Sequence, residues 1–234
     1  MKTVVVASSS DIGKKMPLFE QAVDILGKRL KNLDIGFVDS DKTTDNILSL
    51  SSDLVVVAGS DTLLNEVLNK LENTEAVIAC LPFGKESRFC RENKMPEDPL
   101  DAVERLALND FRTIHLGYIG DRYFVDEAVI SSGVKEQTME AWVGGERKLA
   151  ERLLINLRPS HRDFSVLVKT YGENTSGIGK LLTGIGGKNT DEYRHATLMK
   201  ILNGRRAVLD GNLVEMEQGS CFVRYVKSPF LFTM

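Results

Sequence analysis

This sequence lacks long apolar runs and any large excess of one charge. Its 33 acidic and 30 basic side chains leave a formal net charge of −3, so charge does not predict binding to nucleic acid. No apolar stretch approaches the roughly 18 residues that a membrane-spanning helix requires. We therefore expect no transmembrane segment, and we expect any contact with a membrane to be peripheral.

Cysteine is scarce, and its placement excludes the usual metal and disulfide patterns. Cys80, Cys90 and Cys221 are odd in number, scattered along the chain and without metal-site spacing. Reduced thiols in a cytoplasmic protein are the simplest interpretation. Residues 3–7 already form an apolar, β-branched segment, so no signal peptide is predicted at the N-terminus. The sequence thus predicts a soluble, cytoplasmic protein.

The first half of the chain alternates short apolar runs with helical patterns. Buried strands are predicted at residues 3–7, 35–39, 54–58 and 76–80, with helices at 17–33, at 43–50 and from residue 61 onward. This alternation predicts right-handed crossovers and a mostly parallel sheet. We expect a Rossmann-like, three-layer α/β domain over residues 1–109.

Residues 110–234 have a different character and predict a β-rich, antiparallel, sandwich-like second domain. The expected elements are hairpins at 111–126 and 205–216, a helix from Trp142 to Leu157, a mobile glycine-rich loop at 171–191 and a strand from Tyr193 to Leu202. The turn of the second hairpin is predicted near Gly211.

Ligands of a parallel α/β sheet bind outside the carboxyl ends of its strands. Here that edge is expected to consist of residues Ser8–Lys15, Gly59–Thr62 and Pro82–Ser87. The middle segment joins a buried strand to a helix through a tight turn, and backbone N–H groups at such a helix start can receive a phosphate. The pattern therefore favours a phosphate-binding edge.

Residues 56–67 read Val-Val-Ala-Gly-Ser-Asp-Thr-Leu-Leu-Asn-Glu-Val. Without a gap, this resembles the Val-Val-Ala-Gly-Gly-Asp-Gly-Thr-Leu-Asn-Glu-Val segment of the diacylglycerol kinase catalytic domain, a family that includes sphingosine kinases and bacterial lipid kinases. The matching positions include Gly59, Asp61, Asn65, Glu66 and Val67. Glycine at such a turn permits close backbone approach to a phosphate, whereas Ser60 and Thr62 add side chains there.

Two further segments continue the resemblance with substitutions. Residues 82–91 match the family at Pro82 and Gly84 but replace its Thr-Gly-Asn-Asp core with Lys-Glu-Ser-Arg. This stretch either holds an anion through its cations or is a solvated loop capped onto a helix. Residues 7–11, Ala-Ser-Ser-Ser-Asp, replace the family's Asn-Pro-x-Ser-Gly, so their hydroxyls either bind phosphate or cap a helix.

The third segment, residues 209–212, reads Leu-Asp-Gly-Asn where the family has Val-Asp-Gly-Glu. Asn212 replaces the glutamate that the family uses to activate the lipid hydroxyl, and an amide cannot act as a base. Asp210 and Gly211 are retained, although this pair alone is also typical of a type I′ turn.

The resemblance implies an ATP-dependent lipid kinase that transfers the γ-phosphate of ATP to a lipid hydroxyl, with ATP and Mg²⁺ as cofactors. Asp61 and Asp210 are the implied catalytic and metal-binding residues. The implied cofactor-binding residues are Ser9, Gly59, Ser60, Thr62, Asn65, Glu66, Gly84, Lys85 and Ser87. The implied partners are a nucleotide and a lipid substrate at the membrane surface.

Two alternatives stay open. The substitutions leave room for a catalytically degenerate relative that binds nucleotides or anions, or that oligomerises; sheet-edge pairing in the β-rich domain would give a homodimer. NAD kinases share the Gly-Gly-Asp-Gly-Thr pattern, but the Asn65-Glu66-Val67 match and the match at residues 82–91 favour the lipid branch.

Overall fold

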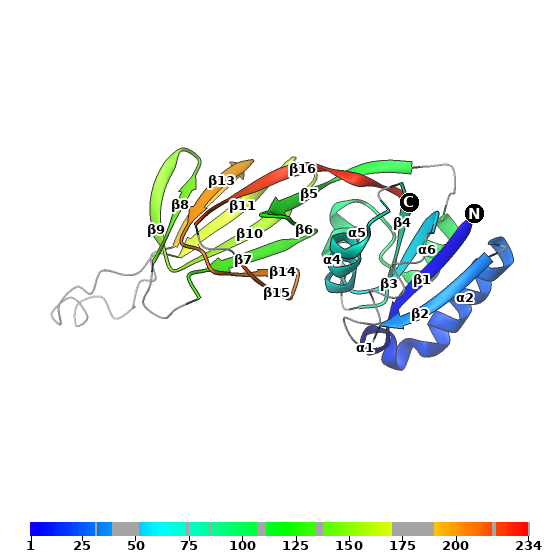
Figure 1. Ribbon diagram of the computed structural model, residues 1–234. Helices are drawn as coiled ribbons and strands as arrows, with labels where there is room; N and C mark the ends of the chain where they lie inside the picture. The colour runs from blue at the N-terminus through cyan, green and yellow to red at the C-terminus, as the bar shows by residue number, and fades with distance from the viewer. Residues whose placement is uncertain are drawn as a thin grey trace, which may run out of the picture. The chain divides into compact units, whose positions relative to one another are not determined.

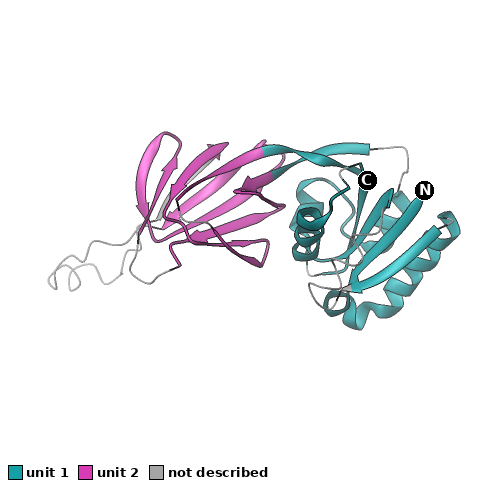
Figure 2. Cartoon of the chain, viewed as in Figure 1, with its two compact units in different colours: residues 1–116, 226–234 teal, residues 117–225 magenta. Residues whose placement is uncertain are grey.

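The chain folds into two compact units (Figure 2). The computed structural model describes residues 1–30, 32–38, 52–73, 75–84, 86–106, 111–133, 138–169, 190–216 and 219–233. The first unit comprises Met1–Leu116 and Val226–Met234, and the second comprises Gly117–Tyr225. The C-terminal residues thus belong to the first unit, whereas the sequence placed them in the second domain. No helix in the described ranges is long and apolar enough to cross a membrane.

The first unit contains a parallel sheet with the strand order β2-β1-β3-β4 (Figure 1). These strands are β1 (Lys2–Ser8), β2 (Asn32–Val38), β3 (Leu54–Gly59) and β4 (Val77–Pro82). Every residue of β3 is buried, as expected for a central strand that is covered on both faces. The predicted mixed α/β architecture with a mostly parallel sheet is therefore confirmed.

Helices cover both faces of this sheet. They are α1 (Ser9–Ile12), the 3₁₀ turn η1 (Gly13–Lys15), α2 (Met16–Arg29), α4 (Asp61–Lys70), α5 (Arg88–Glu92) and α6 (Pro99–Arg105). Residues of α2 and α6 share a hydrophobic core with Val56 of β3. Val57 faces the other side, where it lines a small hollow together with Leu64 of α4. The predicted helix at 43–50 lies outside the described residues.

The second unit is built from antiparallel strands in two sheets. One contains β12 (Thr190–Ala196), β11 (Asp163–Lys169), β10 (Arg152–Arg158), β7 (Glu127–Ser131), β14 (Arg206–Leu209) and β15 (Asn212–Glu215), in that order. The other joins β16 (Ser220–Thr233), β13 (Leu198–Leu202), β8 (Met139–Val143) and β9 (Glu146–Ala150), with β5 (Phe111–Ile119) and β6 (Arg122–Phe124) beside β16. Buried residues of both sheets form one core, which confirms the sandwich-like expectation.

The helix predicted from Trp142 to Leu157 is wrong, because this segment forms the strands β8, β9 and β10. Leucines at 149, 153 and 157 fit a helical spacing, yet residues 153, 155 and 157 also alternate as in a strand, and all three are buried. Gly144 and Gly145 have φ values of +59° and +87° and make the turn of a hairpin.

The strand predicted from Tyr193 to Leu202 is two strands in different sheets, β12 and β13. His195, with a φ of +69°, is the extra residue of a bulge in the pairing with β11, and the break between the two strands follows Ala196. The two predicted hairpins are present: β5 with β6, and β14 with β15. Most of the glycine-rich segment at 171–191 lies outside the described residues.

The β5–β6 hairpin gives a stability prediction. Gly117 lies directly opposite the fully buried Phe124, and a Cβ at residue 117 would overlap the phenyl ring. We expect Gly117→Ala to destabilise the protein by about 2 kcal/mol in urea unfolding, since the ring must leave its packed position. The control is Gly27→Ala in α2, where a Cβ meets nothing within 4 Å and should stabilise the protein by about 1 kcal/mol. Equal stability of Gly117→Ala and wild type would contradict the packing.

Candidate functional site

Asp61 joins two helix starts at the carboxyl edge of the parallel sheet. It is the first residue of α4, directly after β3 and its turn. One carboxylate oxygen accepts a hydrogen bond from the Ser87 hydroxyl at 2.6 Å, and the other accepts one from the Phe89 N–H at 3.0 Å. Ser87 in turn caps α5 by accepting a hydrogen bond from the Cys90 N–H. The carboxylate therefore holds the loop after β4 against the turn after β3.

The turn after β3 is also hydrogen-bonded to a second carboxylate, that of Asp11. Asp11 Oδ2 accepts a hydrogen bond from the Ser60 N–H at 2.8 Å, and Ser8 Oγ accepts one from the Asp11 N–H at 3.2 Å. Ser60 is the N-cap residue of α4, where a backbone N–H is well placed for an anion. Asp11 thus takes the position at this N–H that a phosphate oxygen would take. A Cβ on Gly59 would lie 3.0 Å from Asp11 Oδ2, so this close approach requires glycine.

A third contact joins the segment after β1 to the loop after β4. Lys15 Nζ donates hydrogen bonds to the carbonyl oxygens of Phe83 at 2.9 Å and Gly84 at 3.1 Å. A Cβ on Gly84 would lie 2.8 Å from Ser60 Cβ, so the two turns are in direct contact. The hollow beside Asp61 has a volume of about 10 Å³, enough for no more than one water molecule. The edge is therefore a closed set of mutually bonded loops.

Of the residues predicted to bind the cofactor, Gly59, Ser60, Gly84 and Ser87 come together around Asp61. Ser9 lies in the short helix α1, and Thr62 lies in the first turn of α4. Two others are used within α4: the Asn65 side chain is 3% exposed, and Glu66 forms an ion pair with Lys70 at 3.0 Å. Lys85 lies outside the described residues, and Asp210 belongs to the second unit.

Asp210 forms a buried clamp within the second unit. With φ values of +49° and +93°, Asp210 and Gly211 make the turn of the β14–β15 hairpin. The carboxylate accepts backbone hydrogen bonds from Val125 at 2.6 Å, Asp126 at 2.8 Å and Glu127 at 2.7 Å. Burial raises its pKa from 3.8 to about 7, against these N–H donors, which lower the pKa. The contacts of Asp210 are those of a turn anchor, and its catalytic role stays a prediction.

The number of carboxylates near Asp61 limits how a magnesium ion could be bound there. Within the described ranges, no group of three or more His, Cys, Asp or Glu side chains could hold a metal ion. A nucleotide-bound Mg²⁺ needs one or two carboxylates, because phosphates and water supply the other oxygens. Asp61 fits this limited role, since each oxygen keeps lone pairs beyond its hydrogen bond to Ser87 or Phe89. A phosphate at the Ser60 N–H, in contrast, requires Asp11 to move.

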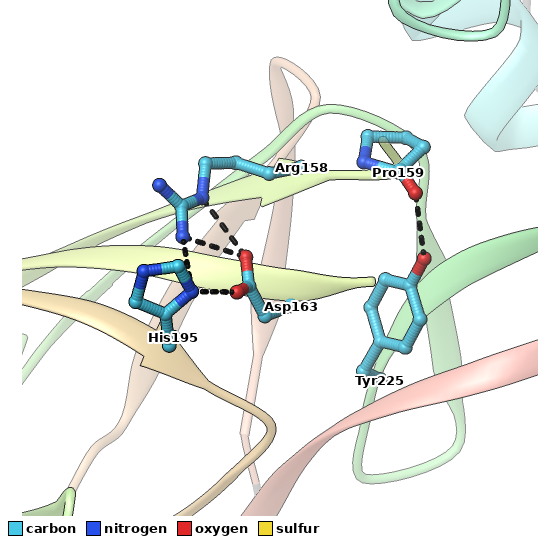
Figure 3. Close-up of polar contacts among 5 residues, drawn as sticks. All are labelled: Arg158, Pro159, Asp163, His195 and Tyr225. Carbon is cyan, nitrogen blue, oxygen red and sulfur yellow. Dashed lines mark hydrogen bonds and ion pairs between the residues drawn. The ribbon is translucent and has the colours of Figure 1, made fainter. Parts of the chain in front are cut away.

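A second polar cluster lies in the second unit, where β10, β11 and β12 meet (Figure 3). Asp163 is 3% exposed; Arg158 Nε and Nη2 donate to its Oδ1, and His195 Nδ1 lies 2.6 Å from its Oδ2. Beside this cluster, the Tyr225 hydroxyl donates to the Pro159 carbonyl oxygen at 3.4 Å. Arg158 and His195 each contact one oxygen of the buried Asp163 carboxylate. The cluster therefore stabilises the β10–β11 turn and the bend at His195.

Sequence reasoning placed Asp11 and Lys15 in the predicted edge segment without giving either a role, and it missed the Asp163 cluster. Asp11 stands where the resemblance places a glycine, and a charged residue at such a turn is a signal that could have been followed. Arg158 and Asp163 lie directly opposite each other in the β10–β11 register, but this pairing appears only once the turn between them is known.

The fold and this edge define a two-domain kinase-type architecture, and three comparisons agree with it. The diacylglycerol kinase catalytic domain family matches residues 3–119, half of the chain. A diacylglycerol kinase from Staphylococcus saprophyticus is 28% identical over 92 residues, and one from Staphylococcus haemolyticus is 26% identical over the same length. These matches span 38% of this chain and only 30% and 28% of those relatives.

Solved structures are similar over nearly the whole chain. A diacylglycerol kinase from Bacillus anthracis has a TM-score of 0.63 at 15% identity, covering 99% of this chain and 96% of that one. An NAD kinase from Archaeoglobus fulgidus, solved in complex with ATP, has a TM-score of 0.60 at 13% identity, covering 100% and 94%. The chain belongs to the diacylglycerol kinase catalytic domain family, and the structural likeness extends that fold to its second unit.

The raised pKa of Asp210 predicts a pH-dependent stability. Between the unfolded value near 3.8 and the folded value of about 7, the folded chain binds one more proton than the unfolded chain. This contribution to stability is therefore complete below about pH 4 and is lost as the pH rises to about 7, with a slope of up to roughly 1.4 kcal/mol per pH unit. Asp210→Asn should flatten the slope in urea unfolding between these pH values. Identical slopes for variant and wild type would show that Asp210 is not the titrating group.

Proposed function

We propose that the protein is a divergent ATP-dependent lipid kinase, which transfers the γ-phosphate of ATP to a lipid hydroxyl. The observation that carries this proposal is the position of Asp61, at the first residue of a helix that follows the central strand of a parallel sheet. A carboxylate there lies beside the backbone N–H groups of a helix start, so it can share a Mg²⁺ ion with bound phosphates. Membership of the family supports this proposal.

Phosphoryl transfer makes modest demands on side-chain chemistry. Its loose transition state is stabilised mainly by positioning and by positive charge, and a bound Mg²⁺ ion supplies that charge between the phosphate oxygens. The loss of a glutamate at Asn212 therefore lowers the efficiency with which a hydroxyl is deprotonated, without removing the main source of catalysis. Asp61 would orient the nucleotide phosphates, and Ser87 and Phe89 fix the direction of its carboxylate.

A groove in the second unit supports a lipid acceptor. It has a volume of about 530 Å³ and lies between the β5–β6 hairpin, the β14–β15 hairpin and the start of β16. Apolar residues make up most of its lining: Ile119, Ala207, Leu209, Val214, Met216, Cys221 and Phe222. Asp121, Arg122 and Glu215 add charged groups to the same lining. A groove whose lining mixes apolar and polar groups suits an amphipathic ligand with a hydrocarbon chain and a polar head.

A second candidate function is favoured by a specific contact. The hydrogen bond from Ser60 N–H to Asp11 places a negative charge where a phosphate would bind, and Lys15 is bonded to two carbonyl oxygens across the same edge. This contact favours a non-catalytic relative, which binds nucleotides or other anions, or oligomerises, without transferring phosphate. In the kinase candidate, ATP displaces Asp11 from the Ser60 N–H; in the non-catalytic candidate, Asp11 keeps this hydrogen bond.

Titration calorimetry with ATP, with and without Mg²⁺, tests the kinase proposal. We expect Mg²⁺-dependent binding to the wild type and its loss in Asp61→Asn. This variant removes the charge but keeps the fold, because the amide can donate to Ser87 Oγ while its oxygen accepts from the Phe89 N–H. A protein that binds MgATP but moves no phosphate to any diacylglycerol or sphingoid lipid would leave the non-catalytic candidate.

Asp11 gives a second, independent test on the same edge. Asp11→Ala frees the Ser60 N–H and removes a like charge, so it should tighten ATP binding by roughly ten- to a hundredfold, the value of one hydrogen bond to a charged group. Asp11→Asn is the control, since it keeps an acceptor on the N–H and loses only the charge. An unchanged affinity in Asp11→Ala would place the phosphates elsewhere, and absence of binding in every variant would support the non-catalytic candidate.

A further inference from the structure

The outer face of one sheet in the second unit carries an unusual set of side chains. Strands β9, β8, β13 and β16 lie side by side in that order (Figure 1). Directly opposite residues share a face, so the row Trp142–Lys200–Phe222 crosses β8, β13 and β16 on one side. The alternate residues, Met199 among them, are buried in the core. The row therefore points away from the core.

Large apolar side chains are exposed along this face. Trp142 is 42% exposed, Phe222 45%, Leu149 53% and Leu198 55%. These four are among the eleven large hydrophobic residues that are exposed in the described ranges, and they lie on four adjacent strands. A solvated face of an antiparallel sheet normally carries polar side chains, and clustered apolar exposure marks an interaction surface.

Cations are interleaved with these apolar groups. Lys200 Nζ lies 5.9 Å from the centroid of the Phe222 ring, and the Arg224 guanidinium lies 5.2 Å from that of Tyr118. Among the described residues, neither cation has a carboxylate partner within ion-pair distance. The third cation, Arg147, is paired with Glu140, the one acidic residue among those described on the face. Three cations and one carboxylate leave this face locally positive, in a chain whose net charge is −3.

We propose that this face, made of Trp142, Leu149, Leu198, Lys200, Phe222 and Arg224, docks onto the surface of an anionic lipid bilayer. Tryptophan and phenylalanine are favoured at the boundary between headgroups and acyl chains, where one side of the ring meets hydrocarbon. Lys200 and Arg224 extend from the same surface and would contact lipid phosphates. The combination of exposed apolar area and unpaired cations matches the two components of an anionic membrane surface.

Charge decides between a bilayer and a second copy of this chain. In a two-fold dimer the same patch meets itself, so a face that carries three cations and one carboxylate would bring an excess of like charge into the contact. Like charges in a dry contact are costly, whereas anionic headgroups complement them. Phe222 also lines the groove described above, so the face and the groove share a side chain. The face therefore fits a bilayer better than a protein partner of its own kind.

Vesicle binding tests this proposal, and the single tryptophan of the chain makes it direct. Trp142 emission should shift to shorter wavelength with vesicles of phosphatidylglycerol and phosphatidylcholine in equal parts, and much less with phosphatidylcholine alone. Added salt should weaken the binding of the wild type to the anionic vesicles. The double variant Lys200→Glu with Arg224→Glu should lower the partition coefficient by more than about 25-fold, since each basic residue near such a surface contributes about fivefold and the new carboxylates are repelled by it.

Matched variants on other strands of the same unit provide the controls. Arg152→Glu changes an exposed cation of β10, and Leu213→Ser changes an exposed leucine of β15; both should bind vesicles as the wild type does. Trp142→Ser should lose vesicle binding in a sedimentation assay. Circular dichroism of each variant without vesicles confirms that the fold is kept. The assay contains no nucleotide, so its outcome is independent of the kinase proposal.

Three results would overturn the proposal. One is equal binding to neutral and anionic vesicles without an effect of salt. Another is unchanged binding of both the double charge variant and Trp142→Ser. The last is a dimer in sedimentation velocity that Trp142→Ser abolishes, together with no vesicle binding, which would assign the face to a second copy of the chain.

Discussion

The hydrogen bonds of the Asp61 carboxylate hold the carboxyl edge of the first unit together. They tie the start of α4 to the start of α5 and thereby fix the loop after β4 against the turn after β3. Asp11 and Lys15 add contacts between the same turns, and Gly59 and Gly84 permit the close approach. The Ser60 N–H and the Asp61 carboxylate, two of the groups predicted to meet a nucleotide, are therefore also part of the hydrogen bonding of this edge. A phosphate at the Ser60 N–H would compete with Asp11 for the same donor.

The same construction recurs in the second unit with Asp210. There a buried carboxylate collects three backbone N–H groups and anchors a hairpin turn whose backbone has positive φ. Both aspartates are the charged members of motifs that resemble catalytic segments, and both have enough structural contacts to explain their presence. An aspartate that stays in such a motif after the surrounding residues have changed is thus weak evidence for catalysis by itself. Functional measurements on Asp61 must keep its capping contacts intact.

Much of the fold followed from the sequence because its strongest signals are local. The unbroken apolar runs of β1, β3 and β4 and the turn at Gly211 depend on neighbouring residues alone. The errors have a common cause: the segment from Trp142 to Leu157 satisfies both helical and alternating patterns, and only pairing with distant strands decides between them. The Asp11–Ser60 contact spans 49 positions, so the charge of Asp11 in its own turn is visible in the sequence, whereas its partner is not.

The second unit adds an argument about the acceptor that the first cannot supply. A sandwich of two sheets buries one face of each sheet, and the outward face is free to evolve toward water or toward a partner. In β8, β13 and β16 that outward face carries Trp142, Lys200 and Phe222 instead of short polar residues. Phe222 belongs to both this face and the groove, so the proposed membrane surface and the groove of the proposed lipid acceptor share a side chain. A hydrophobic acceptor is concentrated in the bilayer, so the proposed docking through this face and the proposed acceptor groove support each other within one unit of the protein.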